Sequence, residues 1–190
     1  SVYRLQQKGL TNIPEEGAAL LVCNHVSFVD PIVIAAASRR PIRFVMDYRI
    51  YRTPLINFVF RHMHAIPIAP ARDDAAMMEA AFEAVASALE AGELVAIFPE
   101  GKITDTGELY PFRPGVQRIV GRTPVPVIPM ALQGLWGSFF SRKDGPAMSK
   151  PLRRGMFSRI ALVVGTAIVP AAATPEHLQE VVAGLRGEWK

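Results

Sequence analysis

The amino-acid sequence predicts an α/β fold in a single domain that spans residues 1–190. Short apolar runs alternate along the chain with segments whose apolar side chains recur at helical spacing, a pattern typical of alternating strands and helices. The length of 190 residues suits one domain, and no internal repeat or low-complexity linker marks a boundary. Half of the residues are hydrophobic and only 20% are charged, so a sizeable core can form.

The apolar runs are expected to form the strands of a central sheet. Each run is short and dominated by apolar residues, as a strand buried within a sheet tends to be. In chain order the predicted strands are Ala19–Cys23, Arg43–Met46, Ala65–Ile68, Leu94–Phe98, Val127–Ala131 and Ile160–Val164.

The clearest helical pattern runs from about Asp73 to Ala91. Acidic residues suit the start of a helix, and Gly92 supplies a stop at its end. Its apolar face consists of Met78, Ala81, Phe82, Val85 and Leu89. Further helices are expected at Pro31–Ser38, Pro54–Phe60, Gly115–Gly121 and Pro175–Gly187. The segment Pro99–Pro114 is long for a loop of a compact domain, and long ordered loops are often functional.

Charge and hydropathy favour a function connected with lipid. The net charge is +4 and the mean hydropathy is +0.21, yet no apolar run approaches the ~20 residues that span a bilayer. Basic residues cluster within Arg39–Arg52 and Lys150–Arg159, where they attract anionic headgroups or form ordinary solvated surface. Aromatic residues accompany arginines in Tyr48–Phe60 and Leu135–Lys143, which suits a membrane surface or core packing. No basic–aromatic nucleic-acid motif is present, so nucleic acid is not an expected partner.

The cysteine and histidine content predicts neither a disulfide nor a metal site. Cys23 is the only cysteine and lies in a predicted buried strand, which fits a reducing compartment and an inert thiol. His62 and His64 are two residues apart, but no nearby carboxylate or cysteine completes a zinc set.

The segment Asn24–Asp30 carries the strongest chemical signal. His25 follows a predicted strand, and side chains at the carboxyl ends of strands form the sites of open α/β sheets. A short turn would bring Asp30 within hydrogen-bond reach of the imidazole, where a carboxylate fixes the tautomer and stabilises the imidazolium. This segment therefore predicts a general base with its orienting carboxylate. A buried histidine beside a helix-capping aspartate is the alternative.

A second polar segment follows the strand predicted at Leu94–Phe98. Glu100 stands just past the end of that strand, and Gly101 permits close approach of a ligand to the backbone. Lys102 and Arg113 offer positive charge for a phosphate. Taken alone, this segment could equally be a strand-to-loop turn with a surface glutamate.

Taken together, these segments resemble the glycerolipid acyltransferase family, the lysophosphatidic-acid-acyltransferase-like enzymes. The resemblance runs from about Arg4 to Val169 and rests on four blocks. They are Asn24–Asp30, Ala65–Ile68 with the later Arg72, Phe98–Gly101, and Val125–Ala131. In the second block the family usually has a glycine before the strand, where this chain has Met63 and His64. The family fold implies a mixed, mostly parallel β-sheet flanked by helices.

The third block departs from the commonest form of the family, which continues with Thr-Arg-Ser after Glu-Gly. This chain has Lys102-Ile103-Thr104, a variant similar to the acyltransferase domain of bacterial acylglycerophosphoethanolamine acyltransferases. Such domains can be fused to a lysophospholipid transporter or an acyl-carrier-protein synthetase, and a start at Ser1 fits excision from a longer chain. The resemblance implies a location at the cytoplasmic face of the bacterial inner membrane.

The resemblance implies acyl transfer from acyl-carrier protein or acyl-CoA to a lysophospholipid, without a further cofactor or a metal. It makes His25 the general base and Asp30 its orienter, and it gives Glu100 and Gly101 contacts with the glycerol part of the acceptor. The expected phosphate contacts are Arg72 and Lys102, then Arg113, while Asn24 is expected to fix the turn around His25. The alternatives are a thioesterase and a non-catalytic lipid-binding module, which Ile103 in place of arginine favours.

Overall fold

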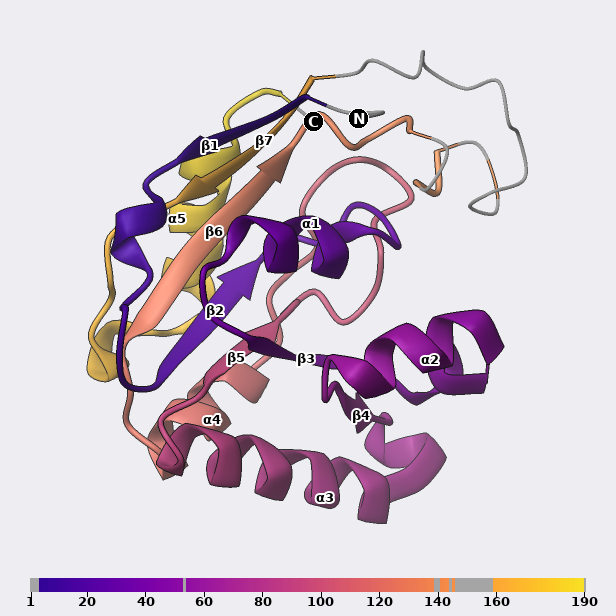
Figure 1. The fold of residues 1–190 in the computed structure, drawn as a ribbon, viewed down its shortest axis with the longest axis vertical. Coiled ribbons are helices and arrows are strands. Elements are labelled where there is room, and N and C mark those ends of the chain that lie inside the picture. The colour runs from indigo at the N-terminus through magenta and orange to yellow at the C-terminus, as the bar shows by residue number, and fades with distance from the viewer. Residues whose placement is uncertain (1–3, 53, 139–140, 144, 146–158, 190) are drawn as a thin grey trace.

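A computed structural model describes residues 4–52, 54–138, 141–143, 145 and 159–189. A seven-stranded sheet runs through the molecule in the order β1-β7-β6-β2-β5-β3-β4 (Figure 1). The strands are β1 (Arg4–Lys8), β2 (Ala19–Cys23), β3 (Ile42–Asp47), β4 (Ile66–Ile68), β5 (Leu94–Ile97), β6 (Val127–Gln133) and β7 (Arg159–Val164). All neighbouring pairs are parallel except β6 and β7, so the sheet is mixed and mostly parallel, as the sequence predicts.

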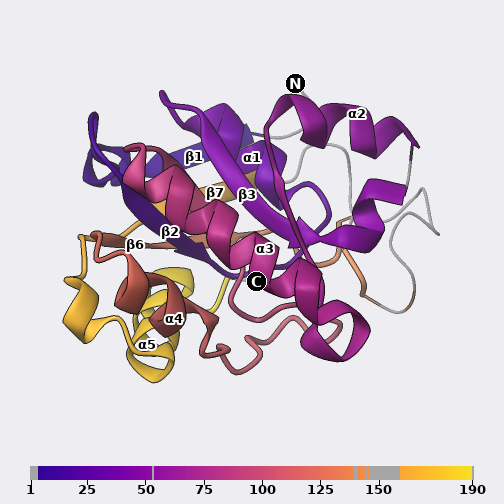
Figure 2. The ribbon, with the colours of Figure 1, turned by 90° about the horizontal axis from the view of Figure 1, so that it is seen from below.

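Helices cover both faces of the sheet, with α1 and α2 on one face and α4 and α5 on the other (Figure 2). The α-helices are α1 (Asp30–Ala37), α2 (Pro54–His62), α3 (Ala71–Glu90), α4 (Gly115–Arg122) and α5 (Pro175–Arg186). Short 3-10 turns occur at η1 (Leu10–Asn12), η2 (Tyr48–Arg52) and η3 (Pro170–Ala172). Each helix predicted from the sequence overlaps one of these α-helices.

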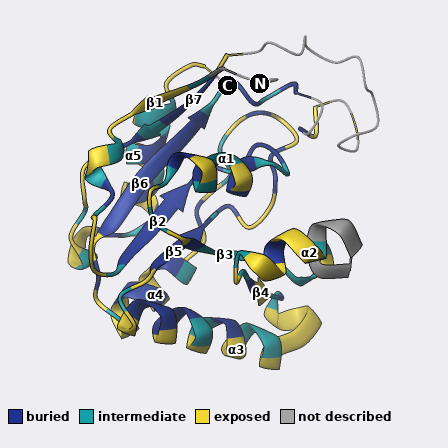
Figure 3. Cartoon of the chain, in the orientation of Figure 1, coloured by how far each residue is buried: buried dark blue, intermediate teal, exposed yellow. Residues whose placement is uncertain are grey.

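The central strand β2 is apolar throughout because both of its faces are covered (Figure 3). Leu21 and Cys23 face the half of the core that also contains Ile34 of α1. Leu20 and Val22 face the other half, which α3, α4 and α5 complete. With both faces buried, only the carboxyl end of β2 is left to present polar side chains.

The long helix α3 begins with a separate turn. Asp74 has an extended backbone, with φ −159° and ψ 95°, and its Oδ1 accepts the Met77 N–H at 2.9 Å. This is an N-cap bond, because a side-chain oxygen there satisfies an otherwise unpaired helix donor. The regular helix therefore starts where the acidic pair in the sequence predicts, and Ala71–Asp73 form a preceding turn.

Strand β1 is an element that the hydrophobic pattern does not reveal. Arg4–Lys8 is mostly polar, and it forms one edge of the sheet by pairing in parallel with β7.

Among the described residues, no helix has the length and apolar character of a bilayer-spanning segment.

Candidate active site

The candidate site forms where β2 and β5 end side by side in the sheet. Val22 of β2 is in register with Ile97 of β5, so residues three positions further along each chain meet. Those residues are His25 and Glu100, and both precede loops at the carboxyl edge of the sheet. Figure 1 shows α1 and the loop after β5 meeting at this edge.

Asp30 collects hydrogen bonds from the whole turn that contains His25. Its Oδ2 accepts His25 Nδ1 at 2.9 Å, the Val26 N–H at 2.7 Å and the Ser27 N–H at 2.9 Å. Its Oδ1 accepts the Ser27 hydroxyl at 2.7 Å. The carboxylate is fully buried, so these donors replace the water it has lost. The predicted contact between His25 and Asp30 is therefore present.

The imidazole of His25 is oriented for proton transfer at its second nitrogen. Because Nδ1 donates to Asp30, Nε2 is the nitrogen that can accept a proton. The ring stacks on Phe98 with centroids 4.2 Å apart and planes inclined by 20°. The side chain is 14% exposed, so the imidazole is recessed but reachable.

Glu100 bonds to the backbone of His25, and its expected contact with the acceptor stays a prediction. Its Oε1 accepts the His25 N–H and its Oε2 accepts the Tyr110 N–H, each at 2.7 Å. The residue is only 2% exposed, so both carboxylate oxygens are engaged by backbone donors within the fold. Burial raises the pKa of Glu100, while the two backbone N–H groups oppose that shift.

Asn24 bonds to the backbone of β6. Its side-chain amide donates to the Leu132 carbonyl at 3.1 Å and accepts the Leu132 N–H at 2.8 Å. The residue is fully buried and extends the pairing of β2 with β6 by one side chain. Its side-chain bonds to Leu132 therefore fix the end of β2 against β6, next to His25.

Of the predicted phosphate contacts, the structure brings Arg113 and Lys102 to the second loop and leaves Arg72 apart. Gly101 has φ +71°, and a Cβ built there would lie 2.5 Å from the Arg113 guanidinium carbon, so this guanidinium lies directly against the glycine. Lys102 Nζ stands 4.0 Å above the ring of Tyr110. Arg72 is 82% exposed, pairs with Asp73, and follows β4, two strands from β5.

The residue after Lys102 cannot bind a phosphate. Ile103 stands where the commonest family form has arginine, and it is 7% exposed within the loop. The Gly101 N–H donates to the Phe98 carbonyl at 3.0 Å, so this amide is already used. A positive charge at this loop comes from its neighbours, Lys102 and Arg113.

Thr104 and Ser141, which the sequence did not single out, and Ser27, the one serine near His25 that it suggested as a nucleophile, also lie in or against this turn. The Thr104 N–H donates to the His25 carbonyl at 3.0 Å, and Ser141 forms a bridge with Ser27. Ser27 is buried and its hydroxyl donates to Asp30, so it is no free nucleophile. The Ser27-x-x-Asp30 spacing is a helix-start signal that could have revealed that bond. Tyr110 acts through its backbone, which has no side-chain signature.

The Cys23 thiol lies buried near the site and is not suited to act as a nucleophile there. Burial raises the pKa of the Cys23 thiol, and the nearby Asp30 and Glu100 carboxylates raise it further. A protonated, buried thiol is a poor nucleophile. No group of three or more metal-binding side chains occurs in the part of the chain that the structure describes.

Comparison with known proteins agrees with the geometry. A 1-acyl-sn-glycerol-3-phosphate acyltransferase from Brassica napus chloroplasts is 29% identical over 133 residues, which are 70% of this chain and 38% of that protein. An enzyme of the same description from Borreliella burgdorferi is 24% identical over 124 residues, 65% of this chain and 49% of that one. The chain thus spans 38% and 49% of the length of these two relatives.

The fold is also found in a solved structure. The crystal structure of the 1-acyl-sn-glycerophosphate (LPA) acyltransferase from Thermotoga maritima matches with a TM-score of 0.71 at 19% identity, over 95% of this chain and 68% of that one. The sequence profile of the Acyltransferase family matches residues 4–133, which include every strand except β7 and the whole His25–Asp30 turn. This chain therefore belongs to the Acyltransferase family.

Proposed function

We propose that the protein transfers a fatty acyl group from a thioester to a free hydroxyl of a lysoglycerophospholipid, with His25 as general base. The observation that carries this proposal is the 2.9 Å hydrogen bond between His25 Nδ1 and the buried Asp30 carboxylate. It leaves Nε2 available and stabilises the positive charge that the ring acquires. The family membership of the chain supports acyl transfer as the reaction class.

The proton moves through His25 in both halves of the reaction. The acceptor oxygen attacks the thioester carbonyl carbon while Nε2 takes the hydroxyl proton. The tetrahedral intermediate then collapses, the carbon–sulfur bond breaks, and the proton on Nε2 passes to the departing sulfur. An ester and a free thiol result, and His25 returns to its neutral state. No acyl-enzyme is required, in keeping with the buried, hydrogen-bonded Ser27 hydroxyl.

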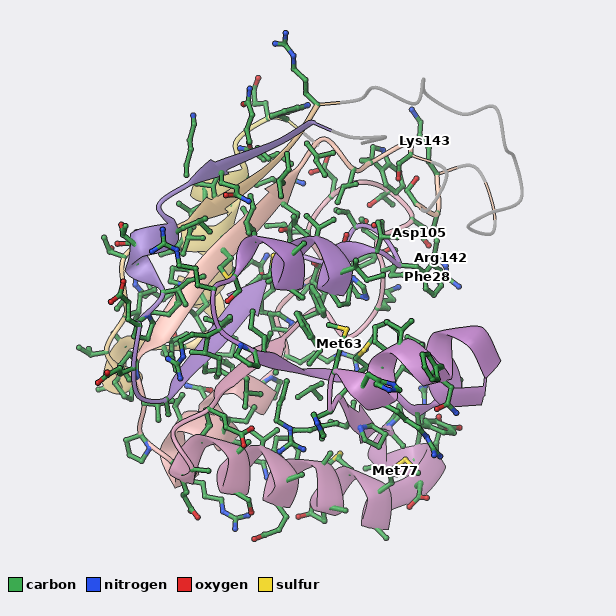
Figure 4. The ribbon with its side chains drawn as sticks, in the orientation of Figure 1. Phe28, Met63, Met77, Asp105, Arg142 and Lys143 are labelled. Atoms are coloured by element: carbon green, nitrogen blue, oxygen red, sulfur yellow. The ribbon has the colours of Figure 1, made fainter. Side chains whose placement is uncertain are left out.

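The acceptor is proposed to carry a phosphate that lies against Arg113 and Lys102. The Arg113 guanidinium lies against Gly101, and the Lys102 ammonium lies over the ring of Tyr110, whose N–H shares Glu100 with His25. Named relatives act on 1-acyl-sn-glycerol-3-phosphate, which makes lysophosphatidate the first acceptor to test. The Lys102-Ile103-Thr104 variant makes lysophosphatidylethanolamine the second. Asp105, Phe28 and Arg142 lie at the same end of the molecule and could contact a headgroup (Figure 4).

A membrane surface is the proposed source of the acceptor, at the cytoplasmic face of a bacterial inner membrane. Helix α2 exposes 64% of Phe58 and 38% of Val59, followed by the exposed residues Arg61 and His62. Apolar side chains beside basic ones suit the boundary of an anionic lipid layer. Phe139, Phe140 and the basic residues from Lys150 to Arg154, which the sequence also suggests for this role, lie outside the described residues.

The decisive experiment is product analysis by mass spectrometry. The protein is incubated with lysophosphatidate or lysophosphatidylethanolamine, and with acyl-CoA or acyl-carrier protein as separate donors. We expect a diacyl product, and its loss in His25→Ala and Asp30→Asn under conditions in which both variants are folded. His177→Ala is the matched control, because His177 is an exposed histidine on α5. Full activity of His25→Ala would overturn the proposed mechanism.

The same assay separates the alternatives. A thioesterase releases free fatty acid at the same rate with and without the lysophospholipid. A non-catalytic lipid-binding module binds vesicles and turns over none of the donor and acceptor pairs. Whether transporter or synthetase domains are fused to this domain, as the resemblance implies, is tested by sequencing the whole gene that encodes it.

A further inference from the structure

Two side chains of the C-terminal helix α5, Gln179 and Arg186, form hydrogen bonds with the loop between β5 and α4. Gln179 Oε1 accepts the Phe112 N–H at 3.0 Å. Arg186 donates through Nη1 to the Gly107 carbonyl at 2.8 Å and through Nη2 to the Glu108 carboxylate at 3.2 Å. The Arg186 side chain is only 11% exposed, and its bond to the Gly107 carbonyl is partly buried, whereas the Glu108 side chain is 56% exposed. Helix α5 lies wholly outside residues 4–133, which the family profile matches.

Helix α5 is a firm support for this loop. Leu178 and Val182 are fully buried in the half of the core that covers one face of β2. At the C-terminal end of the helix, Gln133 Nε2 of β6 donates to the Leu185 carbonyl at 3.0 Å and to the Arg186 carbonyl at 2.8 Å. The helix is thereby tied to the same strand that receives Asn24.

The contact that Arg186 makes with the loop leads through Thr104 to the carbonyl of His25. The Thr104 hydroxyl donates to the Glu108 carbonyl at 2.8 Å and accepts the Gly107 N–H at 3.0 Å. The Thr104 N–H then donates to the His25 carbonyl at 3.0 Å. The Arg186 contact is thus two hydrogen bonds from the backbone of the proposed base.

The contact that Gln179 makes with the loop leads through Tyr110 and Glu100 to the N–H of His25. Phe112, which Gln179 holds, is two residues from Tyr110, whose N–H donates to Glu100 at 2.7 Å. The other oxygen of Glu100 accepts the His25 N–H, also at 2.7 Å. Both backbone polar groups of His25 therefore bond to parts of the loop that α5 restrains.

We infer that Gln179 and Arg186 are positioning residues for the proton transfer at His25. A general base must lie within about 3 Å of the hydroxyl whose proton it takes, and small displacements of it reduce the rate steeply. The two side chains set that position by restraining the loop, without touching the substrate. The inference rests on the proposed function of His25.

The test compares Arg186→Ala, Arg186→Lys and Gln179→Ala with the control Arg122→Ala. Arg122 is the last residue of α4, and its exposed ion pair is made with Glu83 of α3 and not with the loop. We expect kcat to fall at least about 10-fold in Arg186→Ala and Gln179→Ala, with the KM for the lysophospholipid within about 2-fold of wild type. Arg186→Lys should recover part of kcat, because an ammonium can still donate to the Gly107 carbonyl. The control should match wild type.

Nuclear magnetic resonance supplies a readout that does not depend on turnover. The backbone amide resonances of His25 and Tyr110 should shift in Arg186→Ala and Gln179→Ala, and stay in place in Arg122→Ala. Unchanged amide resonances and unchanged kcat in the folded variants would overturn the inference, as would a loss confined to KM. If Arg186→Ala fails to fold, Gln179→Ala decides by the same criteria. If wild type has no acyltransferase activity the proposed function fails, while the amide shifts still report on the restraint.

Discussion

The carboxylate of Glu100 accepts the backbone N–H of His25 at 2.7 Å, so the residue after β5 fixes the residue after β2 through the main chain. The other carboxylate oxygen accepts the Tyr110 N–H at the same distance. The ring of His25 is held separately, by Asp30 and by stacking on Phe98. Backbone and side chain of the proposed base are thus positioned by different partners, which can be removed one at a time.

Replacing Glu100 by glutamine should reduce kcat by about 10- to 100-fold while the protein stays folded. A glutamine has one acceptor oxygen, so either the His25 or the Tyr110 N–H would face an amide NH₂. The unpaired donor would let the His25 backbone move, and a small displacement of a general base reduces the rate steeply, by tenfold for each ~1.4 kcal/mol lost at the transition state. Steady-state kinetics with saturating donor measures the effect. Glu83→Gln, on the exposed face of α3, is the control, and equal kcat values for the two variants would contradict the prediction.

The raised pKa of Glu100 should also appear as a pH dependence of stability. Since burial raises this pKa above the ordinary value of 4.5, the folded state holds the proton more tightly than the unfolded state. The contribution of Glu100 to stability is therefore present below pH 4.5 and is lost as the pH rises through the folded-state pKa. The difference in unfolding free energy between wild type and Glu100→Gln should fall over this interval. Urea denaturation at a series of pH values measures it, and a constant difference would rule out the shift.

Ser27→Ala should keep most of the activity, because the hydroxyl supports Asp30 and does not attack the substrate. Its Oγ lies 2.7 Å from Asp30 Oδ1 and is buried. We expect a loss of about 1.5–3 kcal/mol in unfolding free energy, the range for a bond to a charged group, with kcat reduced less than about 10-fold. Asp30→Asn should lose about 1,000-fold or more, since it disturbs the tautomer of His25. Inactivity of Ser27→Ala together with an acyl adduct on Ser27 in wild type would reverse this assignment.

The sequence predicts the frame of this site well, because that frame depends on periodicity. The apolar runs at β2 and β5 mark strands buried on both faces. Because these strands are parallel and neighbours in the sheet, His25 and Glu100, which follow them, lie at the same sheet edge. The fold class and the family are both confirmed. The His25–Asp30 hydrogen bond follows from a turn of fixed length, and its catalytic role stays a prediction.

What the sequence could not provide is the environment of each polar side chain. Glu100 and Asn24 have the residue types of substrate contacts, yet both are buried on backbone groups of other segments. Their partners, Tyr110 and Leu132, meet them only after the chain has folded. Arg113, in contrast, comes close to Gly101 in the fold although it is twelve residues away in the sequence, because the loop between them folds back. The edge strand β1 escaped detection because its residues are polar.

His64→Gly should stabilise the protein by about 0.5–1 kcal/mol. His64 follows α2 with φ +50°, the only non-glycine residue with positive φ among those the structure describes. A left-handed conformation costs a side-chain-bearing residue about 1–2 kcal/mol, and the greater freedom of glycine in the unfolded chain offsets part of the gain. Denaturant unfolding measures the change. His64→Val should destabilise, and the same sign of effect in both variants would contradict this explanation.

Arg40→Ala should destabilise the protein without impairing the site. Its guanidinium donates to the carbonyls of Pro14 and Gly17 at 2.8 Å and of Gly92 at 2.9 Å. These residues precede β2 and β5, so one side chain joins three segments at the amino ends of the strands, opposite His25.

Because Arg40 is partly buried and a charged donor strengthens each bond, we expect its removal to cost about 2–3 kcal/mol in unfolding free energy. Arg40→Lys should lose less, since a single ammonium can still reach some of the three carbonyls. The neighbouring Arg39 is exposed, and Arg39→Ala should change stability by less than about 0.5 kcal/mol. Urea unfolding of the three variants measures the effect on stability. The kcat of each variant, measured well below its melting temperature, shows whether the site at the opposite end of the sheet is affected. A fall in kcat of folded Arg40→Ala would mean that the amino ends of the strands also set the position of His25.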